Sequence, residues 1–149
     1  MTEKTVIIIP ARYASRRFEG KPLALLVGST GVGRSLIQRS WDTACEVPGV
    51  DDIFVATDDE RIAQAVWDFG GQVIMTSDTC RNGTERVAEA LQGLAMPADV
   101  VVNLQGDSPL TPPWFITRLI EEMKRDHEIQ MATPVLECDG HTLNMFLED

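Results

Sequence analysis

Short runs of β-branched and apolar residues alternate along this chain with segments whose apolar residues recur at helical spacing. Residues 5–9 form the first run, and comparable runs occur at 52–56, 72–75 and 99–104. A short run that is apolar throughout suits a strand buried on both faces. Because strands and helices alternate, we predict an α/β fold with a mainly parallel sheet and helices on both of its faces.

Four segments between and after these runs have the spacing of amphipathic helices. We expect Asp58 or Asp59 to cap the second helix, and Thr111 to cap the fourth, with Pro112 as its first residue. Residues 129–135 are interpreted as a fifth strand, confined to an edge by Pro134. The four apolar stripes are Leu36, Ile37, Trp41 and Ala44; Ile62, Val66 and Phe69; Val87, Leu91 and Leu94; and Phe115, Ile116, Leu119, Ile120 and Met123.

The length and net charge of the chain limit how many domains it can form and which partners it can bind. A chain of 149 residues suits one domain with a hydrophobic core, although no closing strand or helix cap follows Val135. We therefore expect residues 1–149 to be one domain that is incomplete at its C-terminus. The net charge of −10 disfavours nucleic acid and anionic membranes as partners. Without a membrane-length apolar run or a signal peptide, the expected location is cytoplasmic.

The loop after the first strand concentrates positive charge. Four of the chain's 13 basic residues lie within ten positions there. Ser15 adds a hydroxyl group, and Gly20 allows a close approach of the backbone to a ligand. Polyphosphate is bound by this combination, although a solvated basic loop has the same composition. The four cations are Arg12, Arg16, Arg17 and Lys21.

Two further segments should lie at the same edge of the sheet, where ligands of open α/β sheets bind. Asp107 follows the fourth strand, where a carboxylate can hold Mg²⁺ together with phosphate oxygens. Residues 82–86 open a helix, so their N–H groups and Arg86 could meet an anion or a base edge. Each segment taken alone is equally consistent with an ordinary turn or helix cap.

Gly28–Ser35 resembles a different phosphate-binding pattern. This segment differs by one residue from the phosphate loop of ATPases and kinases, with Arg34 in place of the lysine. Since that lysine reaches the β- and γ-phosphates, we interpret Gly28–Gly33 as a flexible turn before a helix.

Six motifs occur in an order that resembles the signature of 3-deoxy-manno-octulosonate cytidylyltransferases. The resemblance runs from about Val6 to about Val135 and implies a Rossmann-like nucleotidyltransferase fold. It also implies that CMP is transferred from CTP to an acidic sugar with release of pyrophosphate, by an enzyme that forms a homodimer. The motifs are Ile8–Ser15, Gly20–Leu23, Val55–Asp58, Met75–Thr76, Gly83–Arg86 and Val102–Asp107.

The same resemblance implies a role for individual residues. Arg12, Lys21 and Asp107 would be catalytic, with Asp107 binding Mg²⁺. Gln105 would face the sugar and the α-phosphate. The other nucleotide contacts would be Ser15 and Arg17 with Arg12 and Lys21 at the phosphates, and Pro10, Ala11 and Arg86 near the cytidine.

Two alternatives stay open on the sequence alone. The chain could be a non-catalytic module that binds a nucleotide or sugar phosphate. It could also belong to a sugar-nucleotide pyrophosphorylase that uses a base other than cytosine.

Overall fold

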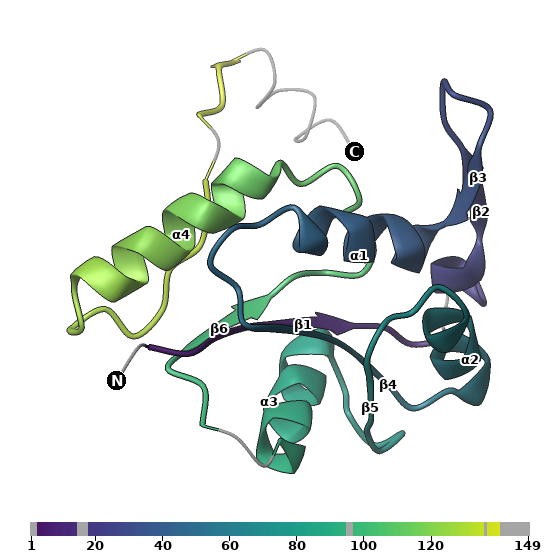
Figure 1. Cartoon of the computed structure of the whole chain (residues 1–149), viewed down its shortest axis with the longest axis horizontal. Coiled ribbons are helices and arrows are strands. Elements are labelled where there is room, and N and C mark those ends of the chain that lie inside the picture. Colours follow the sequence, from purple (N-terminus) through teal and green to yellow (C-terminus); the bar gives the residue numbers. More distant parts are fainter. Residues whose placement is uncertain (1–2, 15–17, 95–96, 136, 141–149) are drawn as a thin grey trace.

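The computed structural model describes residues 3–14, 18–94, 97–135 and 137–140. Its main sheet has the strand order β5-β4-β1-β6, and every pairing is parallel (Figure 1). The central strand β1 is buried along its whole length, as its apolar sequence predicts. Its register places Ile8 beside Phe54 and Asn103. The strands are β1 (Thr5–Pro10), β4 (Asp52–Thr57), β5 (Val73–Met75) and β6 (Val100–Asn103).

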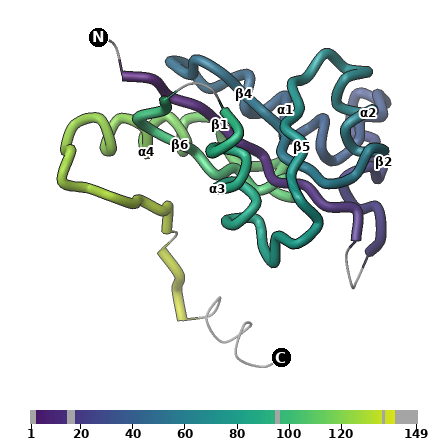
Figure 2. The backbone as a smooth tube through the Cα atoms, turned by 90° about the horizontal axis from the view of Figure 1, so that it is seen from below, coloured from purple at the N-terminus to yellow at the C-terminus, as the bar shows by residue number. Residues whose placement is uncertain are grey.

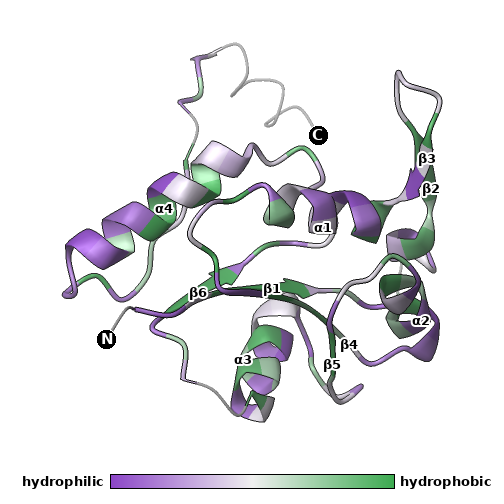
Figure 3. Ribbon diagram, in the orientation of Figure 1, coloured by the Kyte–Doolittle hydropathy of each residue, from purple (hydrophilic) through white to green (hydrophobic). Residues whose placement is uncertain are grey.

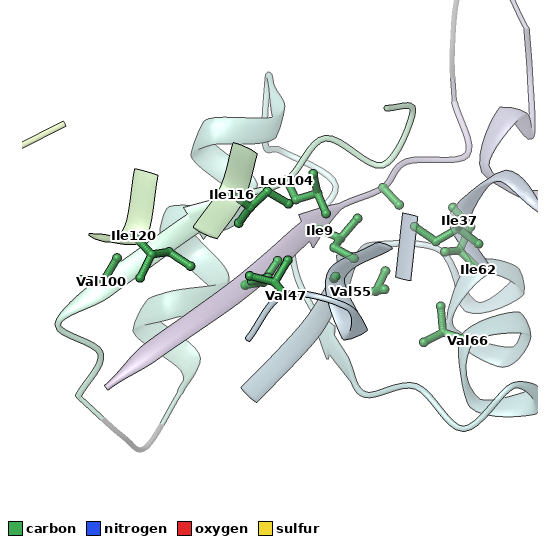
Figure 4. Close-up of a cluster of buried hydrophobic side chains, with 13 residues drawn as sticks. Ile9, Ile37, Val47, Val55, Ile62, Val66, Val100, Leu104, Ile116 and Ile120 are labelled. Carbon is green, nitrogen blue, oxygen red and sulfur yellow. The ribbon is translucent and has the colours of Figure 1, made fainter. Parts of the chain in front are cut away.

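Helices cover both faces of this sheet, which confirms the predicted fold class. Ile7 and Ile9 of β1 pack with three helices on one face, whereas Val6 and Ile8 pack with α3 on the other (Figure 1). Figure 4 shows part of the larger cluster, where Ile9 lies among side chains from neighbouring strands and helices. The three helices on the first face are α1 (Leu36–Cys45), α2 (Glu60–Asp68) and α4 (Pro113–Arg125), and α3 spans Gly83–Gly93.

The glycine-rich segment before α1 is the turn of a β-hairpin that the sequence analysis did not predict as a whole. Strand β2 (Leu25–Val27) pairs antiparallel with β3 (Gly33–Ser35), and Gly31 adopts a φ of 74° between them. The hairpin extends from the body of the molecule (Figure 3). The side chains of Leu25, Leu26 and Val27 on it are exposed. Apolar and polar residues do not alternate along residues 25–27 and 33–35. These two segments therefore lack the usual sequence pattern of a half-buried strand.

Two predictions near the end of the described chain are wrong. Residues 129–135 form no strand and run away from the sheet (Figure 2). Pro134 cannot donate a ladder hydrogen bond, and Met131 and Val135 are exposed. Helix α4 has Pro112 as its N-cap and begins at Pro113, so Thr111 is not its cap. The prediction that the domain is incomplete after Val135 rests mainly on residues 141–149. These residues lie outside the described residues.

The start of α2 follows the prediction. Asp59 is its N-cap, and the side chain accepts a hydrogen bond from the backbone N–H of Arg61 at 2.9 Å. Among the described residues, no helix is long and apolar enough to cross a membrane.

The turn that follows β6 packs closely against the carboxyl end of β1. A Cβ atom at Gly106 would lie only 2.8 Å from the carbonyl oxygen of Pro10. The Gly106 carbonyl also accepts a buried hydrogen bond of 2.9 Å from the Ser40 hydroxyl of α1. This turn therefore joins two strands and a helix at the edge of the sheet where the predicted site residues lie.

We expect Gly106→Ala to lower the free energy of unfolding by about 1–3 kcal/mol, because the added methyl group must displace backbone rather than a flexible side chain. Urea denaturation measures this change. Gly93→Ala is the matched control, because its added Cβ would lie 4.0 Å from the nearest Ile74 atom. Equal urea midpoints for the two variants would contradict the tight packing described here.

Candidate functional site

A cavity of about 530 Å³ opens at the carboxyl ends of β1 and β6 and at the start of α3. Every predicted site residue that the structure describes lines this cavity. Ser15 and Arg17 lie outside the described residues, so their predicted roles remain predictions. The residues brought together are Pro10, Ala11, Arg12, Lys21, Arg86, Gln105 and Asp107.

An ion pair joins the two loops at the rim of the cavity. Lys21 Nζ donates a 2.8 Å hydrogen bond to Asp107 Oδ2, and both side chains are roughly half exposed. Lys21 follows Gly20, whose φ of 68° makes it the left-handed N-cap of the short 3₁₀ helix η1 (Lys21–Leu23). The loop after β1 and the turn after β6 thus present a cation and a carboxylate to the same space.

Arg86 forms part of the cavity wall and is almost fully buried. Its Nη2 lies 3.1 Å from Asp58 Oδ1, with side-chain exposures of 4% and 23%. Its Nη1 donates a 2.5 Å hydrogen bond to Thr76 Oγ1. The contact with Asp58 is an ion pair rather than a well-aligned hydrogen bond, because Asp58 Oδ1 accepts no hydrogen bond from the described residues. Arg86 therefore links α3 to the ends of β4 and β5.

We did not predict Asp58 and Thr76 as site residues, although they belong to the motifs Val55–Asp58 and Met75–Thr76. Each comes directly after a strand, beyond Thr57 of β4 and Met75 of β5. A signal for their role was available, since polar residues at the carboxyl ends of parallel strands gather at one edge. Nothing in the sequence pairs them with Arg86.

A second polar cluster fixes the loop beside the cavity. Glu89 of α3 accepts hydrogen bonds from the Cys80 thiol at 3.1 Å and from the Ser77 backbone N–H at 2.5 Å. The Cys80 hydrogen bond is the main reason that the pKa of Glu89 lies below its ordinary value, followed by the Ser77 N–H. Burial and the nearby Glu89 raise the pKa of the Cys80 thiol. Cys80 thus lines the cavity as a neutral thiol.

The side chains at this cavity that could bind a metal suit an ion that is also bound by the phosphate groups of a ligand. Across the described residues, no group of three or more His, Cys, Asp or Glu side chains is placed to hold a metal ion. Asp107 nevertheless offers an exposed carboxylate at the rim. Mg²⁺ is commonly held by one or two carboxylates together with substrate phosphates and water. The residues present therefore fit Mg²⁺ bound jointly by Asp107 and a nucleotide.

The interpretation of Gly28–Gly33 as a turn before a helix, rather than a phosphate loop, fits the structure except that Gly33 begins a strand. Residues 28–32 form the turn of the hairpin and Gly33–Ser35 form β3, and none of these residues lines the cavity. The helix that follows them, α1, is capped by the side chain of Ser35, which accepts a hydrogen bond from Gln38 N.

A parallel α/β sheet with basic and acidic side chains around a cavity at its carboxyl edge is the arrangement expected of a nucleotide-binding enzyme. A family model described as cytidylyltransferase matches residues 6–145, so this chain belongs to the cytidylyltransferase family. The predicted resemblance is confirmed by its relatives. Curated proteins named 3-deoxy-manno-octulosonate cytidylyltransferase match over most of this chain, and the match covers only about half of each of them.

Two curated relatives and one solved structure illustrate the match. The Maricaulis maris protein is 50% identical over 91% of this chain and 50% of its own length. The Arabidopsis thaliana mitochondrial protein is 48% identical over 89% of this chain and 44% of its own. The solved structure of a CMP:2-keto-3-deoxy-manno-octonic acid synthetase complexed with CTP is 42% identical, with a TM-score of 0.78, covering 85% of this chain and 50% of that one.

A Leptospira borgpetersenii cytidylyltransferase structure shares only 21% identity but has a TM-score of 0.68 over 84% of this chain and 50% of that one. It supports the Rossmann-like nucleotidyltransferase fold alone. The chain therefore has the fold and the sequence of this family over about half the length of its curated relatives.

Proposed function

We propose that this chain is the nucleotide-binding domain of an enzyme that transfers CMP from CTP to an acidic sugar and releases pyrophosphate. The observation that carries the proposal is the convergence of Arg12, Lys21 and Asp107 on one cavity. The names of the similar proteins support CTP as the nucleotide and 3-deoxy-manno-octulosonate, or a similar sugar acid, as the acceptor.

In this proposal the triphosphate lies against Arg12 and Lys21, while Asp107 holds Mg²⁺. Ser15 and Arg17 would add phosphate contacts. The cytidine lies near Pro10, Ala11 and Arg86, and Gln105 faces the sugar and the α-phosphate. Lys21 would then turn from Asp107 toward the phosphates, because the positively charged ammonium group and Mg²⁺ repel each other at one carboxylate. Nucleotide and metal binding would therefore replace the ion pair between Lys21 and Asp107 with two interactions, one between Lys21 and a phosphate group and one between Asp107 and Mg²⁺.

The residues would act by positioning and by electrostatic stabilisation. The sugar hydroxyl oxygen attacks the α-phosphorus and gives up its proton to water. The bond between the α-phosphorus and the oxygen that bridges to the β-phosphorus breaks, and pyrophosphate leaves with the negative charge. Lys21 and Arg12 would donate charge-assisted hydrogen bonds to the phosphate oxygens, each contributing about 1.5–3 kcal/mol. When bound, Mg²⁺ would neutralise part of the same charge.

Pyrophosphate release from CTP tests this proposal. We expect release that requires CTP, 3-deoxy-manno-octulosonate and Mg²⁺ together, with reactions lacking the sugar as controls. Release with UTP in place of CTP would instead support a pyrophosphorylase for another base. Binding of CTP with no release under any condition would support a module that binds nucleotide without turnover.

The proposal also includes a cytoplasmic location and a homodimer, with neither nucleic acid nor a membrane as partner. The net charge of −10 supports the last two statements. Light scattering during size-exclusion chromatography measures the oligomer directly, and a monomer mass across the concentration range would overturn the dimer.

A further inference from the structure

We propose that Arg61 is a positioning residue that acts through Tyr13 to hold the loop carrying Arg12 and Lys21 in its binding conformation. Arg61 lies on α2 and does not line the cavity, and neither residue belongs to the predicted site. The inference rests on the proposed function, because it concerns how the nucleotide is bound.

The guanidinium group of Arg61 lies directly over the aromatic ring of Tyr13. Its Cζ atom is 3.3 Å from the ring centroid, which is a close cation–π contact. Asp59 orients the guanidinium group, since Arg61 Nε donates to Asp59 Oδ1 at 2.9 Å and Nη2 donates to Asp59 Oδ2 at 2.7 Å. Asp59 is itself fixed as the N-cap of α2. The cation is therefore held over the ring by a rigid helix end.

Tyr13 in turn closes the base of the basic loop. Its carbonyl oxygen accepts a 2.9 Å hydrogen bond from the backbone N–H of Gly20. Its ring lies so close to Gly20 that an added Cβ would be 3.0 Å from two ring carbons. Gly20 also needs its left-handed φ of 68° to begin η1. We call this set of residues, Tyr13, Gly20, Asp59 and Arg61, the loop clasp.

The loop clasp acts on both predicted phosphate contacts through the backbone. Arg12 immediately precedes Tyr13, and Lys21 immediately follows Gly20. The clasp therefore sets the distance between the points where these two cations leave the main chain. A loop held in place before the ligand arrives loses less conformational entropy on binding than a free one.

The cation–π contact between Arg61 and Tyr13 should affect CTP binding more than it affects the stability of the fold. The Arg61 side chain is 59% exposed, and its ion pair with Asp59 joins residues two positions apart. Exposed ion pairs of this kind add little to stability. Arg61→Ala should therefore leave the thermal midpoint nearly unchanged while weakening CTP binding by about two- to fivefold, the range of a cation–π contact at an exposed site.

Calorimetric titration with CTP and Mg²⁺ measures the binding effect. The matched control is Arg118→Ala, which removes the same charge and breaks exposed pairs with Glu121 and Glu122 on α4. Arg61→Lys should restore part of the affinity, because an ammonium group also binds an aromatic face. Equal CTP affinities of Arg61→Ala and Arg118→Ala would overturn the inference.

A second readout needs no ligand and so separates this inference from the proposed function. Tyr13 is the single tyrosine of the chain, and labelling tyrosine rings with ¹³C gives NMR signals from that residue alone. We expect those signals to shift in Arg61→Ala and to stay in place in Arg118→Ala. An unchanged Tyr13 spectrum in Arg61→Ala would overturn the loop clasp, even if the protein bound CTP.

Discussion

Asp107→Asn is expected to remove the increase in CTP affinity that Mg²⁺ produces. In the wild-type chain we expect Mg²⁺ to strengthen CTP binding by at least about tenfold, or roughly 1.4 kcal/mol. The asparagine keeps the shape of the side chain but has no negative charge and one fewer acceptor oxygen. CTP should still bind, because Arg12 and Lys21 remain and Lys21 is no longer paired with a charged carboxylate.

Titration of CTP with and without Mg²⁺ measures this effect as a ratio of two dissociation constants. Asp68→Asn is the control, since it makes the same substitution on α2, where the side chain accepts an exposed hydrogen bond from Gln64. Its Mg²⁺ ratio should equal that of the wild type. A full Mg²⁺ effect in Asp107→Asn would show that another group holds the metal.

Arg86→Leu is expected to cause the largest loss of stability, about 3–5 kcal/mol, as found when one partner of a buried ion pair is removed. The guanidinium group is 4% exposed and faces Asp58, Thr76 and Ser77. Its removal leaves the Asp58 carboxylate without its cation and leaves the Thr76 hydroxyl without its donor. Since domains are stable by only about 5–15 kcal/mol, the variant should unfold at far lower urea concentration.

Two further variants make this prediction specific. Arg81→Ala is the matched control, because that side chain is 85% exposed in its pair with Glu85 and should change stability by about 0.5 kcal/mol or less. Combining Arg86→Leu with Asp58→Leu should cost less than the sum of the two single changes, since no unpaired charge remains. Additive losses would mean that the two side chains contribute independently to the fold.

Much of the fold follows from local sequence because its strands are short, apolar and β-branched. The spacing of apolar residues in the sequence locates β1, β4, β5 and β6 to within a residue or two at each end. It misses the β2–β3 hairpin, whose apolar side chains are exposed and whose turn is rich in glycine. It also predicts a strand at residues 129–135, where an apolar pattern exists but no neighbouring strand pairs with it within the described chain.

The candidate site was predictable to the extent that it lies at strand ends. Parallel strands bring their carboxyl ends together, so the loop after β1 and the turn after β6 had to meet. The partners of Arg86 and the Arg61–Tyr13 stack were not predictable in this way. They depend on which helix end lies beside which loop, and that is decided by packing of α2 and α3 rather than by any local pattern.

The central claim is that the cavity at the ends of β1 and β6 binds CTP. Calorimetric titration of this 149-residue chain with CTP, UTP, GTP and ATP, each with and without Mg²⁺, tests it most directly. We predict that CTP binds more tightly than the other three nucleotides and that Mg²⁺ strengthens its binding. Equal affinities for all four, or no binding of CTP, would contradict the account.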